Sequence, residues 1–221
     1  MKEKLIKYFK WFLNSYIWLG LLLLVIDIVT KNVIVQNRNN ILSSGGRNGG
    51  VDLIAGFLGI NYVINTNIVF GLDIFKNEIA NRLVFVIVAV IISAAIIFYL
   101  VKKWGKVNRF YKACLFMIIA GALGNAIDRI FFTSEYLGSE FVGVVDWIDF
   151  YGIWKFNFNI ADSAIVVAVI MLIIYMITVD IIEYRRKSKQ KAPVEEKKEK
   201  VLSKTEQEKN QYLQENKSQD E

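Results

Sequence analysis

The sequence predicts an all-α membrane protein with four transmembrane helices and a small extracytoplasmic β element. Hydrophobic residues make up 54% of the 221 residues, and the chain holds a single proline. The mean hydropathy is +0.36. The apolar residues are clustered, and four clusters reach the length of about 20 residues that a membrane-spanning helix needs. This composition is too apolar for an ordinary soluble domain.

The four expected spans cover roughly residues 12–35, 83–101, 110–132 and 160–184. The first follows a Lys-rich start and therefore resembles a secretory signal. No cleavage site with small residues follows it, because the chain continues Asp27-Ile28-Val29-Thr30-Lys31. We therefore expect an uncleaved first span. The chain has no histidine and a single cysteine, Cys114, which excludes histidine-based catalysis, an intramolecular disulfide and a multi-cysteine metal site.

The placement of the basic residues predicts the topology. They gather before the first span, in the short link between the second and third spans, and after the fourth span. The three groups are Lys2, Lys4, Lys7 and Lys10; Lys102, Lys103, Lys106 and Arg109; and Arg185, Arg186, Lys187, Lys189 and Lys191. Basic residues next to membrane spans favour the cytoplasmic side. Both termini are therefore expected in the cytoplasm, and segments 36–82 and 133–159 are expected outside.

The segments outside the spans differ in composition. Segment 43–50, Ser-Ser-Gly-Gly-Arg-Asn-Gly-Gly, is typical of a flexible loop. Segment 53–64 mixes β-branched and aromatic residues with glycine, which predicts a small sheet on the outer membrane surface. Residues 188–221 are rich in Lys, Glu and Gln. We expect them to form a solvated, disordered cytoplasmic tail after a membrane domain of residues 1–187.

Two aspartates lie in apolar segments, and each follows an asparagine by three residues. They are Asp128 after Asn125, and Asp162 after Asn159. An ionisable side chain within a span is costly and indicates a functional site. The predicted topology brings both carboxylates to one depth near the outer face. Helix geometry places each amide one turn from its carboxylate, where it can orient that carboxylate or contact a substrate backbone. Asn159 is also a candidate N-cap of the fourth span.

Asp27, Lys31 and Arg129 complete the charged set near the outer face. Asp27 and Lys31 are four residues apart on the first span, a spacing that allows an ion pair. Structural support and direct substrate contact both remain open for these two residues. Arg129 is expected either to reach the lipid headgroups or to compensate the two acids.

The paired acids allow two classes of function. Two neighbouring carboxylates do not easily ionise together, so one keeps a proton while the other stays charged. Such a pair activates water as aspartic peptidases do, and it needs no histidine, cysteine or metal. Paired aspartates in a membrane are also what cation or proton transporters use. The spacing alone leaves a hydrolase and an ion-coupled transporter open.

Five segments, in order, resemble the motifs of the lipoprotein signal peptidase family, also called signal peptidase II. They are Asp27-Ile28-Val29-Thr30-Lys31, Asn65-Thr66-Asn67-Ile68-Val69-Phe70-Gly71, Gly121-Ala122-Leu123-Gly124-Asn125-Ala126-Ile127-Asp128-Arg129, Val144-Val145-Asp146-Trp147-Ile148 and Phe158-Asn159-Ile160-Ala161-Asp162-Ser163. The third and fifth segments are the most specific, and they lie on two different expected spans. The resemblance covers roughly residues 12–184.

The resemblance implies an aspartic endopeptidase of the bacterial cell membrane. It would remove the signal peptide from prolipoproteins after diacylglyceryl modification, cutting immediately before the lipidated cysteine. The implied catalytic pair is Asp128 and Asp162. The residues implied to bind substrate or support the site are Asn65, Asn125, Arg129, Asn159, Asp27, Lys31 and Asp146. The implied partners are lipidated signal peptides, membrane lipid and globomycin-type inhibitors; we expect a monomer with no nucleic-acid partner, no metal and no cofactor.

The sequence departs from the family pattern in the second motif. Asn67 stands where glycine is usual, and Ile68-Val69 replaces a pair of small residues. Phe156 stands where a proline is common before the fifth motif. The differences in the second motif concern the loop around Asn65–Gly71, which is expected to cover the substrate, rather than the acid pair. Segment 43–50 and the charged tail are additions to the pattern.

Overall fold

Four long helices follow the apolar runs of the sequence. They are α2 (Ile17–Gln36), α4 (Glu78–Lys103), α5 (Arg109–Phe131) and the helix Ile160–Lys187. A helix bonds its backbone polar groups internally, as a lipid environment demands. Within the described part of the chain, these four are the helices long and apolar enough to cross a membrane. The prediction of four membrane-spanning helices is confirmed, and the second helix begins five residues earlier than expected.

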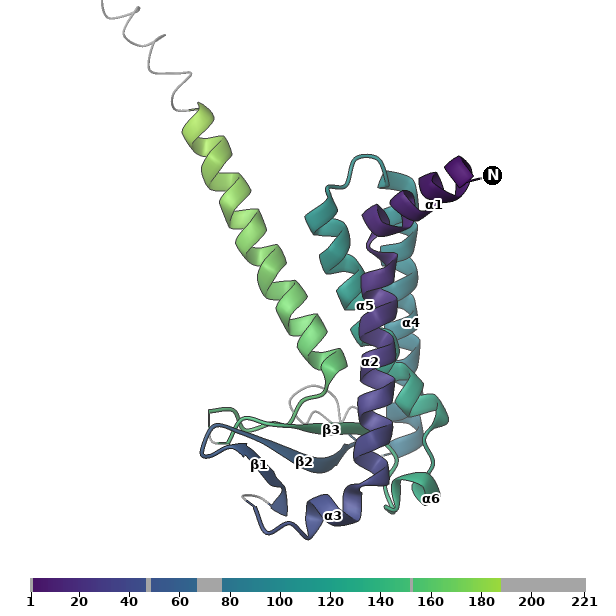
Figure 1. Cartoon of the computed structure of the whole chain (residues 1–221), viewed down its shortest axis with the longest axis vertical. Coiled ribbons are helices and arrows are strands. Elements are labelled where there is room, and N and C mark those ends of the chain that lie inside the picture. The colour runs from purple at the N-terminus through teal and green to yellow at the C-terminus, as the bar shows by residue number, and fades with distance from the viewer. Residues whose placement is uncertain (1, 47–48, 67–76, 152, 188–221) are drawn as a thin grey trace, which may run out of the picture. The chain divides into compact units, whose positions relative to one another are not determined.

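The computed structural model describes residues 2–46, 49–66, 77–151 and 153–187. The chain forms two compact units, Met1–Leu172 and Ile173–Glu221. The first unit holds every element labelled in Figure 1. In the second unit, residues 173–187 are helical and carry one exposed ion pair, between Lys187 and Glu183. The expected tail, residues 188–221, lies outside the described residues.

The first predicted span, residues 12–35, is divided in the structure. A short helix, α1 (Lys2–Ser15), precedes α2, and Tyr16 separates them with a φ of 61°. This left-handed conformation is costly for a residue other than glycine and ends the first helix. Ser15 Oγ accepts a hydrogen bond from the Ile17 amide at 3.2 Å, which satisfies a free donor at the start of α2.

Asparagines begin three of the long helices. Asn77 Oδ1 accepts hydrogen bonds from the Ile79 and Ala80 amides at the start of α4. Asn108 Oδ1 accepts one from the Tyr111 amide at the start of α5, at 2.7 Å. Each side chain satisfies amide groups that have no partner inside the helix. The third such asparagine, Asn159, is part of the candidate site.

Three antiparallel strands form the sheet, in the order β1-β2-β3. They are β1 (Val51–Ile54), β2 (Leu58–Asn65) and β3 (Val144–Asp149). The expected β element of segment 53–64 is confirmed as the β1–β2 hairpin. The third strand comes from the second outer segment and pairs Val63 with Asp146 and Asn65 with Val144. Figure 1 shows the sheet at the end of the helices where α2 stops and α4 starts.

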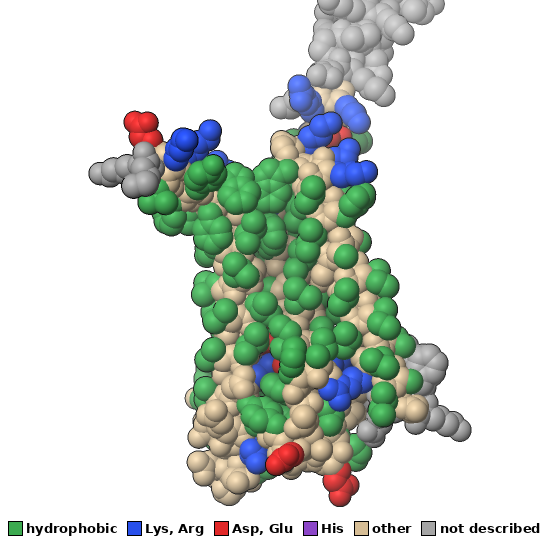
Figure 2. Space-filling model, turned by 90° about the vertical axis from the view of Figure 1, so that its right-hand side faces the viewer, with side chains coloured by type: hydrophobic (Ala, Val, Ile, Leu, Met, Phe, Trp, Pro, Cys, Tyr) green, Lys and Arg blue, Asp and Glu red, His purple; other side chains and the backbone are tan. Residues whose placement is uncertain are grey.

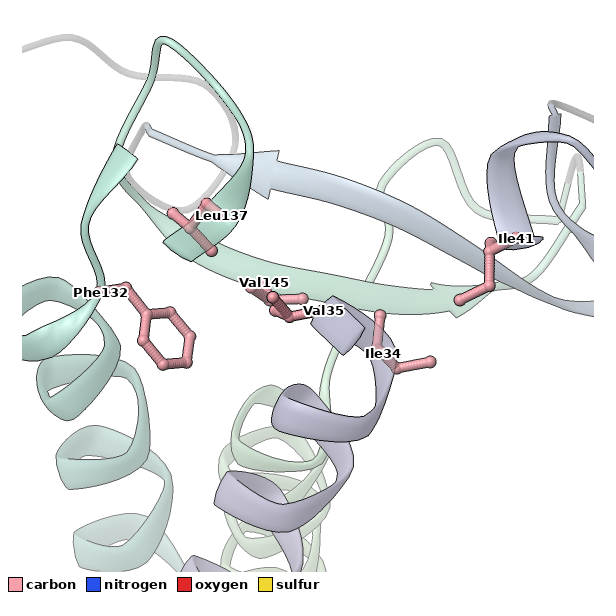
Figure 3. Close-up of a cluster of buried hydrophobic side chains, with 6 residues drawn as sticks. All are labelled: Ile34, Val35, Ile41, Phe132, Leu137 and Val145. Atoms are coloured by element: carbon pink, nitrogen blue, oxygen red, sulfur yellow. The ribbon is translucent and has the colours of Figure 1, made fainter. Parts of the chain in front are cut away.

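An apolar cluster attaches the sheet to the helix ends, as Figure 3 shows. Its buried members come from α2, the short helices α3 (Arg38–Leu42) and α6 (Ser134–Leu137), β3, and the residue that follows α5. They are Ile34, Val35, Ile41, Phe132, Leu137 and Val145. Burying a side chain of this size stabilises the fold by about 1.5–3 kcal/mol. The cluster therefore fixes β3, and the polar residue after Val145, against the helices.

The helices expose much of their apolar surface. On α4, for example, Leu83, Ile87 and Ile91 are more than half exposed. Figure 2 shows hydrophobic side chains covering most of the helical face in view. An apolar patch of this extent on a helix long enough to span a bilayer is suited to contact with lipid.

Candidate active site

All nine polar residues singled out from the sequence lie in one hydrogen-bonded network. They are Asp27 and Lys31 on α2; Asn65 on β2; Asn125, Asp128 and Arg129 on α5; Asp146 on β3; and Asn159 and Asp162 at the start of the helix Ile160–Lys187. Five segments that are distant in sequence therefore meet at one end of the helices. All of these residues belong to the first unit.

Lys31 is the buried cation of the network. Its ammonium group lies 2.7 Å from Asp27 Oδ2 and 2.9 Å from Asp128 Oδ2. It also donates a hydrogen bond to Asn125 Oδ1 at 3.0 Å. The side chain is 0% exposed. The expected Asp27–Lys31 ion pair is present, and Lys31 also neutralises an acid on another helix.

Asp27 connects α2 to the fourth long helix. Its Oδ1 accepts a hydrogen bond from the Ala161 amide at 2.8 Å. That amide lies in the first helical turn, where the backbone donors have no partner inside the helix. A carboxylate at a helix N-terminus is also favoured by the helix dipole. Asp27 therefore helps to hold the start of the helix that carries Asp162.

Asn159 joins two acids with one side chain. Its Oδ1 accepts a hydrogen bond from the Asp162 amide at 2.8 Å, which is the expected N-cap contact. Its Nδ2 donates to Asp146 Oδ1 at 2.7 Å and to Asn125 Oδ1 at 3.2 Å. The side chain is fully buried. The expected N-cap contact is therefore present, but the carboxylate that Asn159 contacts is that of Asp146 rather than that of Asp162.

Asn125 reaches across to the fourth helix. Its Nδ2 donates to Asp162 Oδ1 at 2.7 Å. The sequence suggested that it orients Asp128, its neighbour on the same helix. The structure differs because the Lys31 ammonium binds both Asp128 Oδ2 and the amide oxygen of Asn125. The amide nitrogen of Asn125 is then directed to Asp162.

Asp146 lies on β3 with both carboxylate oxygens bound to amides. Asn65 Nδ2 donates to Oδ2 at 2.9 Å, and Asn159 Nδ2 donates to Oδ1. Burial and, after it, the negative charge of nearby Asp162 raise the pKa of Asp146 to about 7, against the lowering effect of the Asn65 hydrogen bond. The charge of Asp162 therefore disfavours ionisation of Asp146.

Asp128 has a different environment. The charges that act on it most strongly are those of Lys31 and Asp27. Its Oδ2 also lies 3.4 Å from the Val145 amide, which donates to it. Its Oδ1 is buried and has no hydrogen-bond partner among the described residues. The contacts of Asp128 with the Lys31 ammonium and the Val145 amide therefore both go to Oδ2.

Arg129 stays within the protein. It donates from Nη1 to the Asn125 carbonyl at 3.1 Å, and its guanidinium lies 5.1 Å from the centre of the Phe85 ring. Its positive charge acts on Asp146, Asp162 and Asp128, in that order of strength. Of the two roles left open by the sequence, compensation of the acids therefore agrees with its surroundings.

The sequence did not single out Arg82, which secures the end of α5. Its side chain donates hydrogen bonds to the carbonyls of Arg129, Ile130 and Phe132. These carbonyls lie in the last turn, where helix geometry leaves them without a partner. An arginine in the first turn of one apolar helix, after an outer loop, is the signal that could have suggested such a contact. Segment 67–76, which includes most of the expected covering loop, lies outside the described residues.

Residues 2–46, 49–66, 77–151 and 153–187 contain no group of three or more His, Cys, Asp or Glu side chains able to hold a metal ion.

Comparisons with known proteins agree on one family. The family model described as signal peptidase (SPase) II matches residues 19–178. A lipoprotein signal peptidase of Fusobacterium nucleatum is 38% identical over 159 residues, covering 72% of this chain and 84% of that protein. A lipoprotein signal peptidase of Clostridioides difficile is 33% identical over 162 residues, covering 73% and 94%.

Two solved structures of bacterial membrane enzymes are similar to this chain. One, described as a bacterial membrane enzyme structure by the in meso method at 2.3 Å resolution, aligns with a TM-score of 0.56 and 27% identity. The alignment covers 74% of this chain and 88% of that one. A second bacterial membrane enzyme, at 1.9 Å resolution, aligns with a TM-score of 0.54 and 28% identity, over 73% and 92% of the two chains.

Proposed function

Because the chain belongs to the signal peptidase II family of aspartic peptidases, we propose that it removes the signal peptide from diacylglyceryl-modified bacterial prolipoproteins. The cut falls immediately before the lipidated cysteine, near the outer face of the membrane. The observation that carries this proposal is the acid network at one end of the helices, in which Asn159 joins two carboxylate-bearing segments. The family match spans the same segments.

The acid pair that fits this chemistry best is Asp146 with Asp162. Both are tied to Asn159, and the charge of Asp162 raises the pKa of Asp146, as expected of two acids that share one proton. The sequence suggested Asp128 with Asp162. Asp128 is instead ion-paired with Lys31 at 2.9 Å, which favours a supporting role. The two assignments lead to different results in the experiment below.

The proposed mechanism uses the two acids in turn. Asp162 takes a proton from water, and the water oxygen forms a bond to the scissile carbonyl carbon. Asp146, protonated below about pH 7, gives its proton to the carbonyl oxygen, which leaves a tetrahedral diol. The carbon–nitrogen bond then breaks as a proton moves to the leaving nitrogen. Asn125 holds Asp162, and Asn159 and Asn65 hold Asp146, in position for these transfers.

The surroundings of the site suit a substrate that comes from the membrane. The signal peptide is itself an apolar helix, and the long helices expose apolar surface. We propose that the enzyme works as a monomer in the bacterial cytoplasmic membrane, with both termini in the cytoplasm. Membrane lipid and the lipidated signal peptide are its partners, and globomycin-type cyclic peptides are its inhibitors.

The test is cleavage of a purified diacylglyceryl prolipoprotein by the purified full chain, with and without globomycin. Wild-type protein should release the signal peptide, and globomycin should stop the release. Asp146→Asn and Asp162→Asn should each lower kcat by about a thousandfold, within the range for loss of an acid or base. Failure of wild-type protein to cut any lipidated precursor would contradict the proposed activity.

Asp128→Asn separates the two assignments. It keeps the shape of the side chain and leaves Lys31 paired with Asp27. If Asp128 supports the site, this variant should retain cleavage well above that of Asp162→Asn, with the pH profile of the wild type. A loss as complete as that of Asp162→Asn, with an unchanged melting temperature and with cleavage retained by Asp146→Asn, would instead establish Asp128 as the partner of Asp162.

A further inference from the structure

Helix α1 has two opposite faces of different chemistry. Lys4, Lys7 and Lys10 recur every three residues on one side, and all three are exposed. Leu5 and Phe9, four residues apart, mark the other side and are 71% and 60% exposed. At 3.6 residues per turn these two sets fall on nearly opposite sides of the helix. Such a short helix, basic on one face and apolar on the other, is typical of helices that lie in a membrane interface.

The junction with α2 fixes where this helix can lie. Tyr16 is the only residue between α1 and α2, so α1 must start from the membrane surface that α2 crosses. Tyr16 adopts a left-handed conformation, and Trp18 Nε1 donates to the Leu13 carbonyl at 3.0 Å. This indole hydrogen bond satisfies a carbonyl at the end of α1. Figure 1 shows α1 turned away from the direction of α2, so the chain does not continue as one straight span.

An aromatic contact holds α1 against the helices beside it. The Trp11 ring lies 6.0 Å from the Trp104 ring, which follows α4. The Lys112 ammonium on α5 lies 4.2 Å from the centre of the same Trp104 ring. Trp11 lies beside the lysines rather than among the apolar residues of α1. This contact therefore leaves the face of Leu5 and Phe9 uncovered.

We propose that α1 lies in the plane of the membrane and binds anionic phospholipids of the leaflet at which α2 begins. The apolar face enters the boundary between headgroups and acyl chains, while the lysines meet the phosphates. Charge complementarity selects this occupant, because basic residues at a membrane surface attract anionic lipid and the single-residue junction places α1 at that surface. By the positive-inside rule this is the cytoplasmic leaflet. The proposal does not depend on the proposed peptidase activity.

The test measures the depth of α1 in the full chain, reconstituted as one copy per lipid nanodisc. In a Cys114→Ala background, a fluorophore is attached to Phe9→Cys on the apolar face or to Asn14→Cys on the basic side. Discs contain either phosphatidylcholine alone or phosphatidylcholine with phosphatidylglycerol. Nitroxide-labelled lipid reports burial in the bilayer, and aqueous iodide reports exposure to water.

With phosphatidylglycerol, the label at position 9 should be quenched by nitroxide lipid and protected from iodide, and the label at position 14 should show the reverse. Replacing Lys4, Lys7 and Lys10 by Gln should weaken this insertion by about fivefold per lysine. The matched control replaces Lys102, Lys103 and Lys106, exposed lysines outside α1, and should leave insertion unchanged. Cleavage of the prolipoprotein checks that every variant is folded.

Three results would overturn the proposal. A label at position 9 that iodide reaches equally in both kinds of disc would mean that α1 does not insert. Protection that is the same with and without phosphatidylglycerol, and unaffected by loss of the lysines, would exclude recognition of anionic lipid. Protection from iodide without quenching by nitroxide lipid would mean that protein covers this face.

Discussion

The charged side chain of Lys31 is 0% exposed and lies between Asp27 and Asp128. A buried ammonium is tolerated only when it is paired and hydrogen-bonded, and removing one partner of such a pair typically costs about 3–5 kcal/mol. Lys31 therefore pairs with two acids from different helices, and Asn125, which it also contacts, donates to Asp162. At the residue scale, the site consists of an ion-paired part around Lys31 and a part around Asn159, the proton-sharing part, in which we propose that Asp146 and Asp162 share one proton.

The proton-sharing part predicts a pH dependence. The pKa of Asp146 is raised to about 7, and the reaction needs its proton, so kcat/KM should fall as pH rises through about 7. The Asn65 hydrogen bond stabilises the charged form and lowers this pKa. Asn65→Ala should therefore move the alkaline limb of the kcat/KM profile to higher pH. The profile is measured with a lipidated precursor from about pH 5 to about pH 9, a range that extends on both sides of the Asp146 pKa of about 7.

Asn61→Ala is the matched control for that measurement. Asn61 lies on the same strand, and its side chain accepts a hydrogen bond from the Tyr62 amide. Its alkaline limb should stay where the wild type has it. A shift of the Asn65→Ala limb to lower pH, or equal shifts in both variants, would contradict the role given to Asn65.

The raised pKa also has a consequence for stability. A folded-state pKa above the unfolded value means that the folded protein binds this proton more tightly. The stabilisation from Asp146 is therefore complete below the ordinary aspartate pKa of 3.8 and is lost as pH rises through about 7.

Local spacing predicted some of these contacts and not others. The Asp27–Lys31 pair and the N-cap at Asn159 depend on residues four and three positions apart, which helix geometry brings together. The Lys31–Asp128 pair joins two helices. No period within either helix predicts which side chains will meet across them. The sequence pointed to Asp146 as a supporting residue and not as one of the two acids proposed here for catalysis, for the same reason. Its partners come from other segments of the chain.

At the scale of elements, close helix packing places the acids. A Cβ added to Gly124 would lie 2.6 Å from Asp27 Oδ2. One added to Gly121 would lie 2.5 Å from Ile165 Cγ1, and closer still to the Ala161 carbonyl oxygen. Small residues allow helices to approach this closely in a membrane.

Gly121→Ala should therefore displace the start of the helix that carries Asp162. Overpacking typically costs about 1–3 kcal/mol, and a shift of about 1 Å at a catalytic group can cost about a hundredfold in rate. We expect kcat to fall more than the melting temperature suggests, as measured by cleavage and by thermal unfolding in detergent. Gly105→Ala, whose added Cβ meets nothing within 4 Å, should behave as wild type. Equal activity of the two variants would contradict the packing argument.

The elements themselves were predicted unequally well. The long helices follow from runs of apolar residues, and the β1–β2 hairpin from its β-branched composition. Strand β3 was not predicted, because Val144-Val145-Asp146-Trp147-Ile148-Asp149 shows no alternation of buried and exposed residues and its partner strand is far away in sequence. The break at Tyr16 was also missed, since apolar residues on both sides hide the change of direction.

At the scale of the whole molecule, the polar site and the basic residues occupy different ends of the spans. Asp27 and Lys31 lie in the second half of α2, Asp128 lies near the end of α5, and Asp162 lies near the start of its helix. These positions agree in depth only if successive spans run in opposite directions. By the positive-inside rule, we expect the basic link between α4 and α5 to face the cytoplasm and the site to face outward.

This topology predicts which cysteines a membrane-impermeant maleimide reaches in intact spheroplasts. In a Cys114→Ala background, Glu140→Cys, exposed in the segment between α6 and β3, should be labelled without permeabilisation. Lys106→Cys, in the link between α4 and α5, and Lys187→Cys should be labelled only after the membrane is opened. Labelling of Lys106→Cys in intact spheroplasts, with Glu140→Cys protected, would reverse the orientation and place the acids on the cytoplasmic side. In that case a substrate cut near the outer face could not reach Asp146 and Asp162, whatever their chemistry.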